Sequence, residues 1–289
     1  MKIALFGLGY WGKKIYSTLK KKNINVFVVE KKTNDESVDY ISKKDFLLDK
    51  SIQNCFIVTP EETHFSLAKE CLNYKKNVFV EKPLSLKASQ AKELLSISRK
   101  NECFLTVDQV FLYDPSFIFL KKIINKDTLQ KITKISSKRW SVLSCDKKIH
   151  VIQDLMPHDL YIYDALKALD CSILNKNDIN KKVFKKEKAV FSFKKNNVEF
   201  EFDYDWYADS VEREMSFYMD DGEKIIWKKD QGFDKILFYK NGILKKTKVI
   251  DFKNPSPLEL LVDDFLNKKL KLSLKKSIEH ISFMSLFLD

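Results

Sequence analysis

Three of the six glycines in this 289-residue chain lie within six positions, at Gly7, Gly9 and Gly12. A short apolar segment, residues 2–6, comes directly before them, and an amphipathic pattern with helical spacing follows. Glycines gathered at one point indicate backbone positions where a side chain does not fit. The G-x-G-x-x-G spacing between a strand and a helix is the arrangement that binds a dinucleotide pyrophosphate. The sequence therefore predicts a dinucleotide-binding turn at Gly7–Gly12.

Short apolar segments alternate with helical patterns through the first 112 residues. Strands are expected at residues 2–6, 25–30, 54–60, 77–83 and 102–111, with helices between them that include 64–74 and 89–100. Such alternation predicts βαβ units, a parallel sheet, and right-handed crossovers that place helices on both of its faces. We therefore expect a Rossmann dinucleotide-binding domain over residues 1–112.

The second half of the chain has a different pattern. A helix is expected at 115–129 and a strand at 131–143, and successive β-like segments then run from 183 to 251. Polar turns such as KKNN, DDG and KNG separate these segments, as is typical of an antiparallel meander. Helical spacing returns in the last part. The expected fold is α/β, with an α+β substrate-binding and oligomerisation domain over 113–289 that contains a mostly antiparallel open sheet.

The formal net charge of +12 raises the question of nucleic-acid binding. Only three of the 52 basic residues are arginine, namely Arg99, Arg139 and Arg213, and the lysines are spread over the whole chain. Nucleic-acid readers use the arginine fork and gather their charge on one face. We therefore expect a solvated lysine surface and no nucleic-acid partner, while the positive field would still favour an anionic substrate.

Cysteine usage and hydropathy bear on the cellular location. The five cysteines are scattered and form no CxxC pair, which is typical of free thiols in a reducing compartment. We find no signal-peptide pattern and no apolar run long enough to span a membrane. His, Cys, Asp and Glu show no metal-ligand spacing. The expectation is a cytoplasmic protein with no membrane partner and no metal.

Glu30 ends the predicted strand at 25–30, the first strand after the glycines. A carboxylate at this point accepts hydrogen bonds from the adenosine ribose hydroxyls and repels a 2′-phosphate. NAD is therefore the expected cofactor. NADP stays open, because Lys31 and Lys32 follow directly and either side chain offers a phosphate partner.

Five segments, in order along nearly the whole chain, resemble the Gfo/Idh/MocA family of glucose–fructose oxidoreductases and inositol dehydrogenases. They are FGLGYWGKKI, IVTPEETHFSLAKECLNYKKNVFVEKPLS, VDQVFLYDPSFIFLKKII, QDLMPHDLYIYDAL and DWYADSVEREMSFYMDDGEKIIW. The combination of the glycine turn, E-K-P and D-x-x-x-H is more specific than any one of them. The resemblance implies a Rossmann domain and a second domain whose open sheet often builds an oligomer interface, so a homodimer or homotetramer is expected.

Lys82 of the E-K-P motif follows a predicted parallel strand, at the sheet edge where ligands bind in open α/β folds. Pro83 restricts the backbone of Lys82 to extended geometry. Hydride transfer at a hydroxyl-bearing carbon needs a group that moves the hydroxyl proton. The resemblance implies that Lys82 contacts the substrate hydroxyl as a catalytic residue, with Glu81 beside it or on the nicotinamide side.

The D-x-x-x-H motif contains Asp154 and His158. The resemblance implies His158 as the acid/base, and Asp154 as a catalytic residue that contacts the substrate or orients the histidine. Proline is best tolerated in a first helical turn, so the helix is expected to begin near Pro157, with Asp154 just before it. Asp159 is then expected at the helix N-terminus, where negative charge is stabilising.

Further contacts are expected from the same resemblance. Cofactor contacts are expected at Gly7, Gly9, Tyr10, Trp11, Gly12, Glu30, Thr59, Pro60, His64, Glu81 and Lys82. For His64, a structural role is as consistent with the sequence as a functional role. Substrate contacts are expected at Lys82, Gln109, Tyr113, Arg139, Asp154 and His158, with Arg139 offered as the partner of an anionic group.

The expected activity is hydride transfer between NAD(P) and a hydroxyl or ketone of a sugar or nucleotide sugar. The segments FLYDPSF and QDLMPHDL look most like family members associated with surface-polysaccharide gene clusters. Three alternatives remain open at this point. They are a free-sugar or polyol dehydrogenase, a non-catalytic NAD(H)-binding regulator, and a basic nucleic-acid-binding protein.

Overall fold

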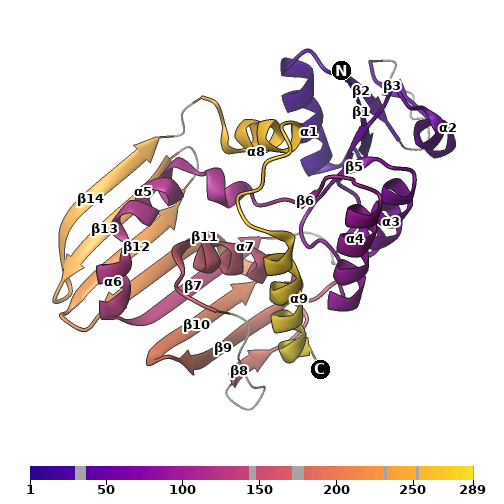
Figure 1. The fold of residues 1–289 in the computed structure, drawn as a ribbon. Helices are drawn as coiled ribbons and strands as arrows, with labels where there is room; N and C mark the ends of the chain where they lie inside the picture. Colours follow the sequence, from indigo (N-terminus) through magenta and orange to yellow (C-terminus); the bar gives the residue numbers. More distant parts are fainter. Residues whose placement is uncertain (30–36, 143–147, 171–178, 231–232, 252–253, 289) are drawn as a thin grey trace. The chain divides into compact units, whose positions relative to one another are not determined.

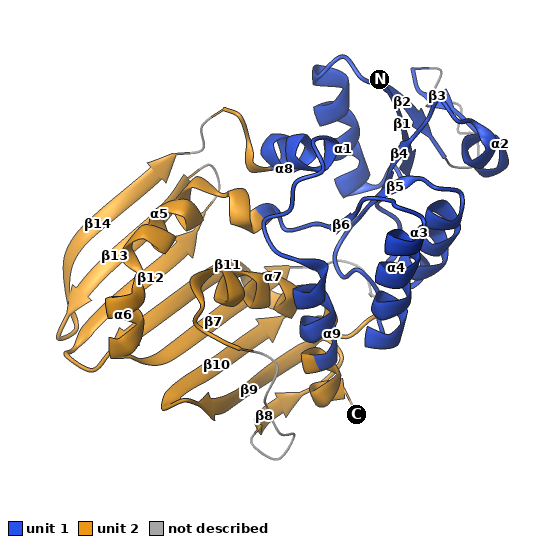
Figure 2. Ribbon diagram, viewed as in Figure 1, with its two compact units in different colours: residues 1–110, 258–282 blue, residues 111–257, 283–289 orange. Residues whose placement is uncertain are grey.

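The computed structural model describes residues 1–29, 37–142, 148–170, 179–230, 233–251 and 254–288. The chain divides into two compact units, shown in different colours in Figure 2. Unit 1 comprises residues 1–110 and 258–282, and unit 2 comprises residues 111–257 and 283–289. The first crossing between the units therefore lies close to the expected boundary at 112. Residues 258–282, expected in the second domain, return to unit 1.

Unit 1 is built on a six-stranded sheet in the order β3-β2-β1-β4-β5-β6 (Figure 1). Its strands are β1 (Lys2–Phe6), β2 (Asn25–Val28), β3 (Asp39–Tyr40), β4 (Asn54–Ile57), β5 (Asn77–Val80) and β6 (Leu105–Val107). Every neighbouring pair is parallel, so the predicted parallel sheet is confirmed. The strand order reverses between β1 and β4, which makes this pair the topological switch point where ligands bind in such sheets.

Helices cover this sheet. They are α1 (Tyr10–Lys21), α2 (Lys43–Leu48), α3 (His64–Asn73), α4 (Ala88–Lys100), α8 (Pro257–Leu266) and the first part of α9 (Leu274–Leu288), with a 3₁₀ turn at Glu61–Thr63. The ring of Phe265 in α8 lies 4.9 Å from that of Phe56, 5.8 Å from Phe79 and 5.9 Å from Phe104, measured between centroids. A parallel sheet needs both faces covered. This aromatic contact explains why α8 joins unit 1.

Unit 2 contains an eight-stranded sheet in the order β14-β13-β12-β11-β7-β10-β9-β8. Its strands are β7 (Ile132–Val142), β8 (Asn180–Phe184), β9 (Lys188–Lys195), β10 (Val198–Asp205), β11 (Tyr207–Met219), β12 (Glu223–Lys229), β13 (Phe233–Lys240) and β14 (Ile243–Asp251). All neighbours are antiparallel except β7 and β10, which are parallel. The predicted mostly antiparallel sheet is confirmed.

The helices of unit 2 are α5 (Pro115–Ile123), α6 (Lys126–Lys131) and α7 (Val151–Leu166), and a 3₁₀ turn, Val110–Tyr113, leads into them. The segment expected as one helix at 115–129 breaks into α5 and α6, because the side chain of Asn125 caps α6 by accepting the Thr128 N–H. Helix α7 lies on one face of the sheet (Figure 1), where the hydroxyls of Tyr163 and Ser137 hydrogen-bond at 2.7 Å.

The expected start of α7 near Pro157 is wrong. The helix begins two turns earlier, at Val151, because His150 forms a capping box with the following turn. Nδ1 of His150 accepts the N–H of Ile152 at 3.2 Å, and Oε1 of Gln153 accepts the N–H of His150 at 3.0 Å. Pro157 thus lies inside the helix, which loses the backbone hydrogen bond that proline cannot donate.

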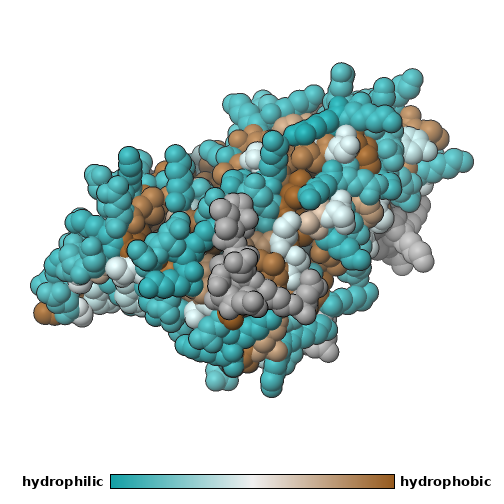
Figure 3. Space-filling model, turned by 60° about the horizontal axis from the view of Figure 1, so that its bottom comes forward, coloured by the Kyte–Doolittle hydropathy of each residue, from teal (hydrophilic) through white to brown (hydrophobic). Residues whose placement is uncertain are grey.

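The side of the protein shown in Figure 3 is mostly hydrophilic, with small separate hydrophobic areas. Among the described residues, no helix combines the length and the apolar character needed to cross a membrane. A search of the same residues finds no group of three or more His, Cys, Asp and Glu side chains arranged to hold a metal ion.

Candidate functional site

The glycine turn joins β1 to α1 at the switch point of the unit 1 sheet. Gly7 has a φ of +89°, and a Cβ at this position would lie 2.4 Å from the carbonyl oxygen of Val58. A Cβ on Gly12 would lie 2.1 Å from the carbonyl oxygen of Gly7. Both positions therefore require glycine for the fold itself. A Cβ on Gly9 would meet no atom of the described residues within 4 Å, so glycine leaves open space beside them.

The N-terminus of α1 borders this open space. Gly9 is the N-cap residue, no side chain caps the helix, and the first turn contains no acidic residue. The amide groups of the first turn and the helix dipole give this end a partial positive charge. An uncapped helix N-terminus beside an open glycine position suits a phosphate group. These features fit the pyrophosphate of a dinucleotide.

Tyr10 and Trp11, expected to contact the cofactor, begin α1. Tyr10 is 77% exposed. Nζ of Lys14 lies 4.3 Å from the centroid of Tyr10 and 4.5 Å from that of Trp11, within cation–π range. The first turn of α1 therefore presents two aromatic rings and one cation, and their contact with a cofactor stays a prediction.

The loop after β4 carries Thr59 and Pro60, next to the glycine turn. Cγ2 of Thr59 lies 3.2 Å from the position that a Cβ on Gly7 would take, and its hydroxyl hydrogen-bonds to that of Thr63 at 2.6 Å. His64 is buried, with Nε2 2.9 Å from the carbonyl oxygen of Thr59. These contacts fix the loop against the turn.

His64 also reaches the E-K-P loop, because its Nδ1 lies 2.8 Å from the carbonyl oxygen of Pro83. Both ring nitrogens thus lie against main-chain carbonyls, and burial lowers the pKa of the imidazole. The side chain links two loops at the sheet edge. The structure accordingly favours the structural interpretation of His64 over the expected cofactor contact.

The ends of β5 and β6 add three buried charged side chains. Glu81 and Lys82 follow β5, and Asp108 follows β6. Burial, together with the charge of Asp108, raises the pKa of Glu81 well above its ordinary value. Asp108 was not predicted as a site residue from the sequence. The feature that could have identified it is its position directly after β6, the strand that pairs with β5.

Gln109 comes next, and its side chain is also buried. Its Oε1 accepts the N–H of Leu272 at 3.3 Å, whereas its Nε2 has no hydrogen-bond partner in the described part of the chain. A buried donor without a partner is costly, so it invites a ligand acceptor or water. The predicted ribose ligand, Glu30, lies outside the described residues.

In unit 2, Asp154 and His158 lie four residues apart within α7 and therefore share one face of the helix. Oδ2 of Asp154 accepts the indole N–H of Trp206 at 3.0 Å. The imidazole of His158 packs edge-to-face on Phe111, with 4.6 Å between centroids. The early start of α7 thus restores the shared face that a start near Pro157 would have removed.

We expect Trp206→Phe to lower the free energy of unfolding by about 1–3 kcal/mol, because it removes a donor from the buried Asp154 carboxylate while keeping most of the ring. Trp140→Phe is the matched control, since the indole nitrogen of Trp140 is buried without a hydrogen-bond partner among the described residues. Urea unfolding of both variants measures the difference. Equal losses would show that the hydrogen bond to Asp154 contributes nothing.

Arg139, expected to hold an anionic group, lies inside unit 2 beside α7. Its Nε and Nη2 contact Oδ1 of Asp159 at 2.8 and 2.6 Å, and the hydroxyl of Tyr204 donates to Oδ2 of Asp159 at 2.8 Å. The charge of Arg139 is thus balanced within the protein. The expected position of Asp159 at a helix N-terminus is wrong, because the helix starts earlier. Tyr113 is buried at the end of its 3₁₀ turn.

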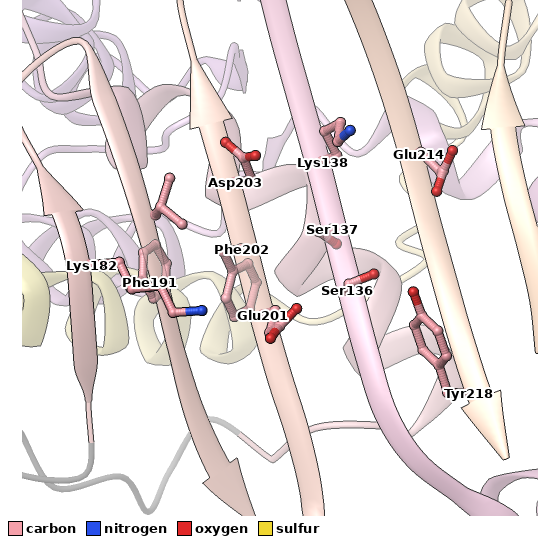
Figure 4. Close-up of a pocket in the computed structure, with 11 residues that line it drawn as sticks. Ser136, Ser137, Lys138, Lys182, Phe191, Glu201, Phe202, Asp203, Glu214 and Tyr218 are labelled. Carbon is pink, nitrogen blue, oxygen red and sulfur yellow. The ribbon is translucent and has the colours of Figure 1, made fainter.

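A hollow of about 280 Å³ lies on the opposite face of the unit 2 sheet (Figure 4). Side chains alternate along each strand, so Arg139 contacts α7 while Lys138 faces the hollow. Acidic groups of β10 and β11 line it together with lysines and Tyr218. Of the predicted site residues that the structure describes, none lines this hollow.

Residues 1–109 match the model of the family described as the oxidoreductase family with an NAD-binding Rossmann fold, GFO_IDH_MocA. The first domain of the chain is therefore similar to the NAD-binding domain of the Gfo/Idh/MocA family. The resemblance found in the sequence, the two-domain fold and the NAD-binding character of the first domain are thereby confirmed.

Individual relatives are similar to this chain over part of their length. The uncharacterized oxidoreductase YdgJ of Escherichia coli is 28% identical over 146 residues, which cover 47% of this chain and 42% of that protein. Inositol 2-dehydrogenase of Salmonella typhimurium is 31% identical over 91 residues, 31% of this chain and 27% of that protein. The aligned parts span less than half of these relatives.

Solved structures are similar to this chain over nearly its whole length. A 3-ketoreductase from Actinomadura kijaniata with NADP and TDP-benzene superposes with a TM-score of 0.80 at 11% identity, covering 99% of this chain and 96% of that one. UDP-N-acetylglucosamine 3-dehydrogenase from Acidithiobacillus ferrooxidans superposes with a TM-score of 0.76 at 17% identity, covering 99% and 95%. At these identities the likeness concerns the fold.

Proposed function

We propose that this protein is an NAD(P)-dependent oxidoreductase that moves a hydride between nicotinamide and a hydroxyl-bearing or ketone carbon of a nucleotide-linked sugar. The observation that carries the proposal lies at the carboxyl edge of the unit 1 sheet. There the open position at Gly9, the uncapped N-terminus of α1 and the E-K-P loop follow β1 and β5. Cofactor and proton-transfer elements thus share one sheet edge.

Lys82 is the proposed proton-transfer group. In the oxidation direction a bound nicotinamide would supply the hydride acceptor for the C–H bond that breaks, and Lys82 would take the hydroxyl proton. Reduction runs the same steps backwards. A lysine does this work only if its environment sets its proton affinity. The buried carboxyl groups of Glu81 and Asp108 are part of that environment.

Asp154 and His158 are proposed as further catalytic residues. The shared face in α7 and the hydrogen bond from Trp206 to Asp154 support a fixed arrangement of these two side chains. In this proposal His158 serves as acid or base, and Asp154 orients it or contacts the substrate. Gln109 and Tyr113 are proposed substrate contacts. The ion pair with Asp159 argues against the same role for Arg139.

The proposed substrate class rests on the two structural neighbours, a 3-ketoreductase with a TDP-linked ligand and a UDP-sugar dehydrogenase. The alternative of a polyol dehydrogenase rests on the inositol 2-dehydrogenase relatives, whose alignment covers about 91 residues. NAD is proposed over NADP because Glu30 would repel a 2′-phosphate. The proposal places the protein in the cytoplasm, and its exposed apolar side chains on the unit 2 strands support a homodimer or homotetramer.

The test is turnover of a sugar panel by the purified protein. We expect NADH to bind more tightly than NADPH, and we expect UDP- and TDP-sugars or their keto forms to be turned over faster than inositol and free sugars. Absorbance at the nicotinamide band follows both binding and reaction. Preference for inositol would favour the polyol dehydrogenase. Tight NADH binding with no turnover of any substrate would favour the non-catalytic regulator.

A further inference from the structure

Glu81 and Asp108 lie side by side at the carboxyl edge of unit 1. Val80 of β5 pairs with Val107 of β6 in parallel register, so the next residue of each strand is one of the two acids. Only 6% of Glu81 and 5% of Asp108 is exposed, so two carboxyl groups are buried beside each other at the ends of neighbouring strands. Two ionised carboxylates offer only acceptors. A hydrogen bond between the two groups would therefore require one proton.

The surroundings decide which carboxyl keeps that proton. Oδ1 of Asp108 accepts the N–H of Val110 at 2.7 Å, which stabilises the ionised form of Asp108. Burial raises the pKa of both carboxyls, but the hydrogen bond from Glu81 and the N–H of Val110 act in the opposite direction on Asp108. Glu81 is thus the proton donor of the pair, and Asp108 is the carboxylate.

Lys82 directly follows Glu81 in the chain, and its charge lowers the pKa of both carboxyl groups. Lys82 is itself buried, with 8% of its surface exposed. If both acids were ionised, the three side chains would carry a net charge of −1 in a low-dielectric place. With one proton on the pair the charges sum to zero. Burial strongly favours the neutral combination.

We propose that Glu81 and Asp108 share one proton, that their remaining negative charge is the built-in counter-charge of Lys82, and that Asp108 is therefore a positioning residue for the proton transfer. This inference rests on the proposed role of Lys82. The counter-charge holds the ammonium at the sheet edge. It also favours the charged form of Lys82, the form that donates the proton in the reduction direction, because a neutral lysine would leave a buried carboxylate without a partner.

Carboxyl ¹³C NMR titration of the purified protein tests the proposal without any need for turnover. The resonances are assigned by their loss in Glu81→Gln and Asp108→Asn. We expect one of the two carboxyls to stay protonated at pH 7. In Lys82→Met we expect the Asp108 titration to move upward by about one pH unit, because a neighbouring cation lowers the pKa of a carboxyl by that much or more. Asp49, whose pKa is lowered by its hydrogen bonds with Ser51, should titrate identically in both proteins.

Two results would overturn the inference. One is ionisation of both carboxyls below pH 6, and the other is an Asp108 titration that does not respond to Lys82→Met. Kinetics supply a second readout, since kcat of the double variant Glu81→Gln/Asp108→Asn should show its lysine-dependent limb about one pH unit lower. An unmoved limb would contradict the positioning role. A protein without turnover would refute the proposed function, while the carboxyl titration would still decide whether the proton is shared.

Discussion

Lys82→Ala is expected to lower kcat by about 10²–10⁴-fold, the range that a positioned proton-transfer group contributes. The side chain follows β5 at the ligand-binding edge, next to the buried carboxyls of Glu81 and Asp108. The dissociation constant of NADH should change little, because the glycine turn and the N-terminus of α1 remain intact. Stopped-flow turnover and fluorescence titration of NADH measure the two quantities separately.

Two further variants separate proton transfer from positive charge. Lys82→Arg keeps the charge, but the guanidinium does not give up its proton at ordinary pH, so kcat should stay low. Lys87→Ala is the matched control, because Lys87 is an exposed lysine shortly after the same motif and should react like the unchanged protein. Full activity in Lys82→Arg would mean that Lys82 contributes charge alone. Full activity in Lys82→Ala would remove Lys82 from the mechanism.

Local patterns in the sequence predicted much of unit 1. Gly7 and Gly12 are required by backbone conformation and by contacts within the same turn, and such short-range constraints are visible in sequence. The buried strands of the parallel sheet are apolar throughout and alternate with helices, which identifies a βαβ fold without knowledge of its contacts.

Contacts between distant segments were not predictable in the same way. The return of α8 to unit 1 depends on ring contacts of Phe265 with Phe56 and Phe79. Such a contact between distant segments cannot be predicted from a local sequence pattern. The start of α7 depends on His150, an uncommon capping residue, and this cap outweighs the preference of proline for a first turn. The pairing of Asp108 with Glu81 required the register of β5 against β6.

Gly12→Ala and Gly9→Ser both add a side chain to a glycine of the same motif. We expect Gly12→Ala to lower the free energy of unfolding, and Gly9→Ser to lower NADH affinity instead. A Cβ on Gly12 would lie 2.1 Å from the carbonyl oxygen of Gly7, so the turn or α1 must shift. We expect a loss of about 3 kcal/mol or more in the free energy of unfolding, at the upper end of overpacking costs. Urea unfolding measures it, and a loss below about 1 kcal/mol would contradict the close contact.

Gly9→Ser leaves the packing of the described residues undisturbed, because none of their atoms lies within 4 Å of the added Cβ. Serine is also a better N-cap than glycine, so the free energy of unfolding should stay the same or rise slightly. Yet the new side chain fills the open space, and its hydroxyl oxygen would occupy an amide group at the start of α1. NADH affinity should therefore fall by about 10–100-fold, or about 1.4–2.8 kcal/mol. Unchanged affinity in a stable Gly9→Ser protein would mean that the pyrophosphate does not bind at this turn.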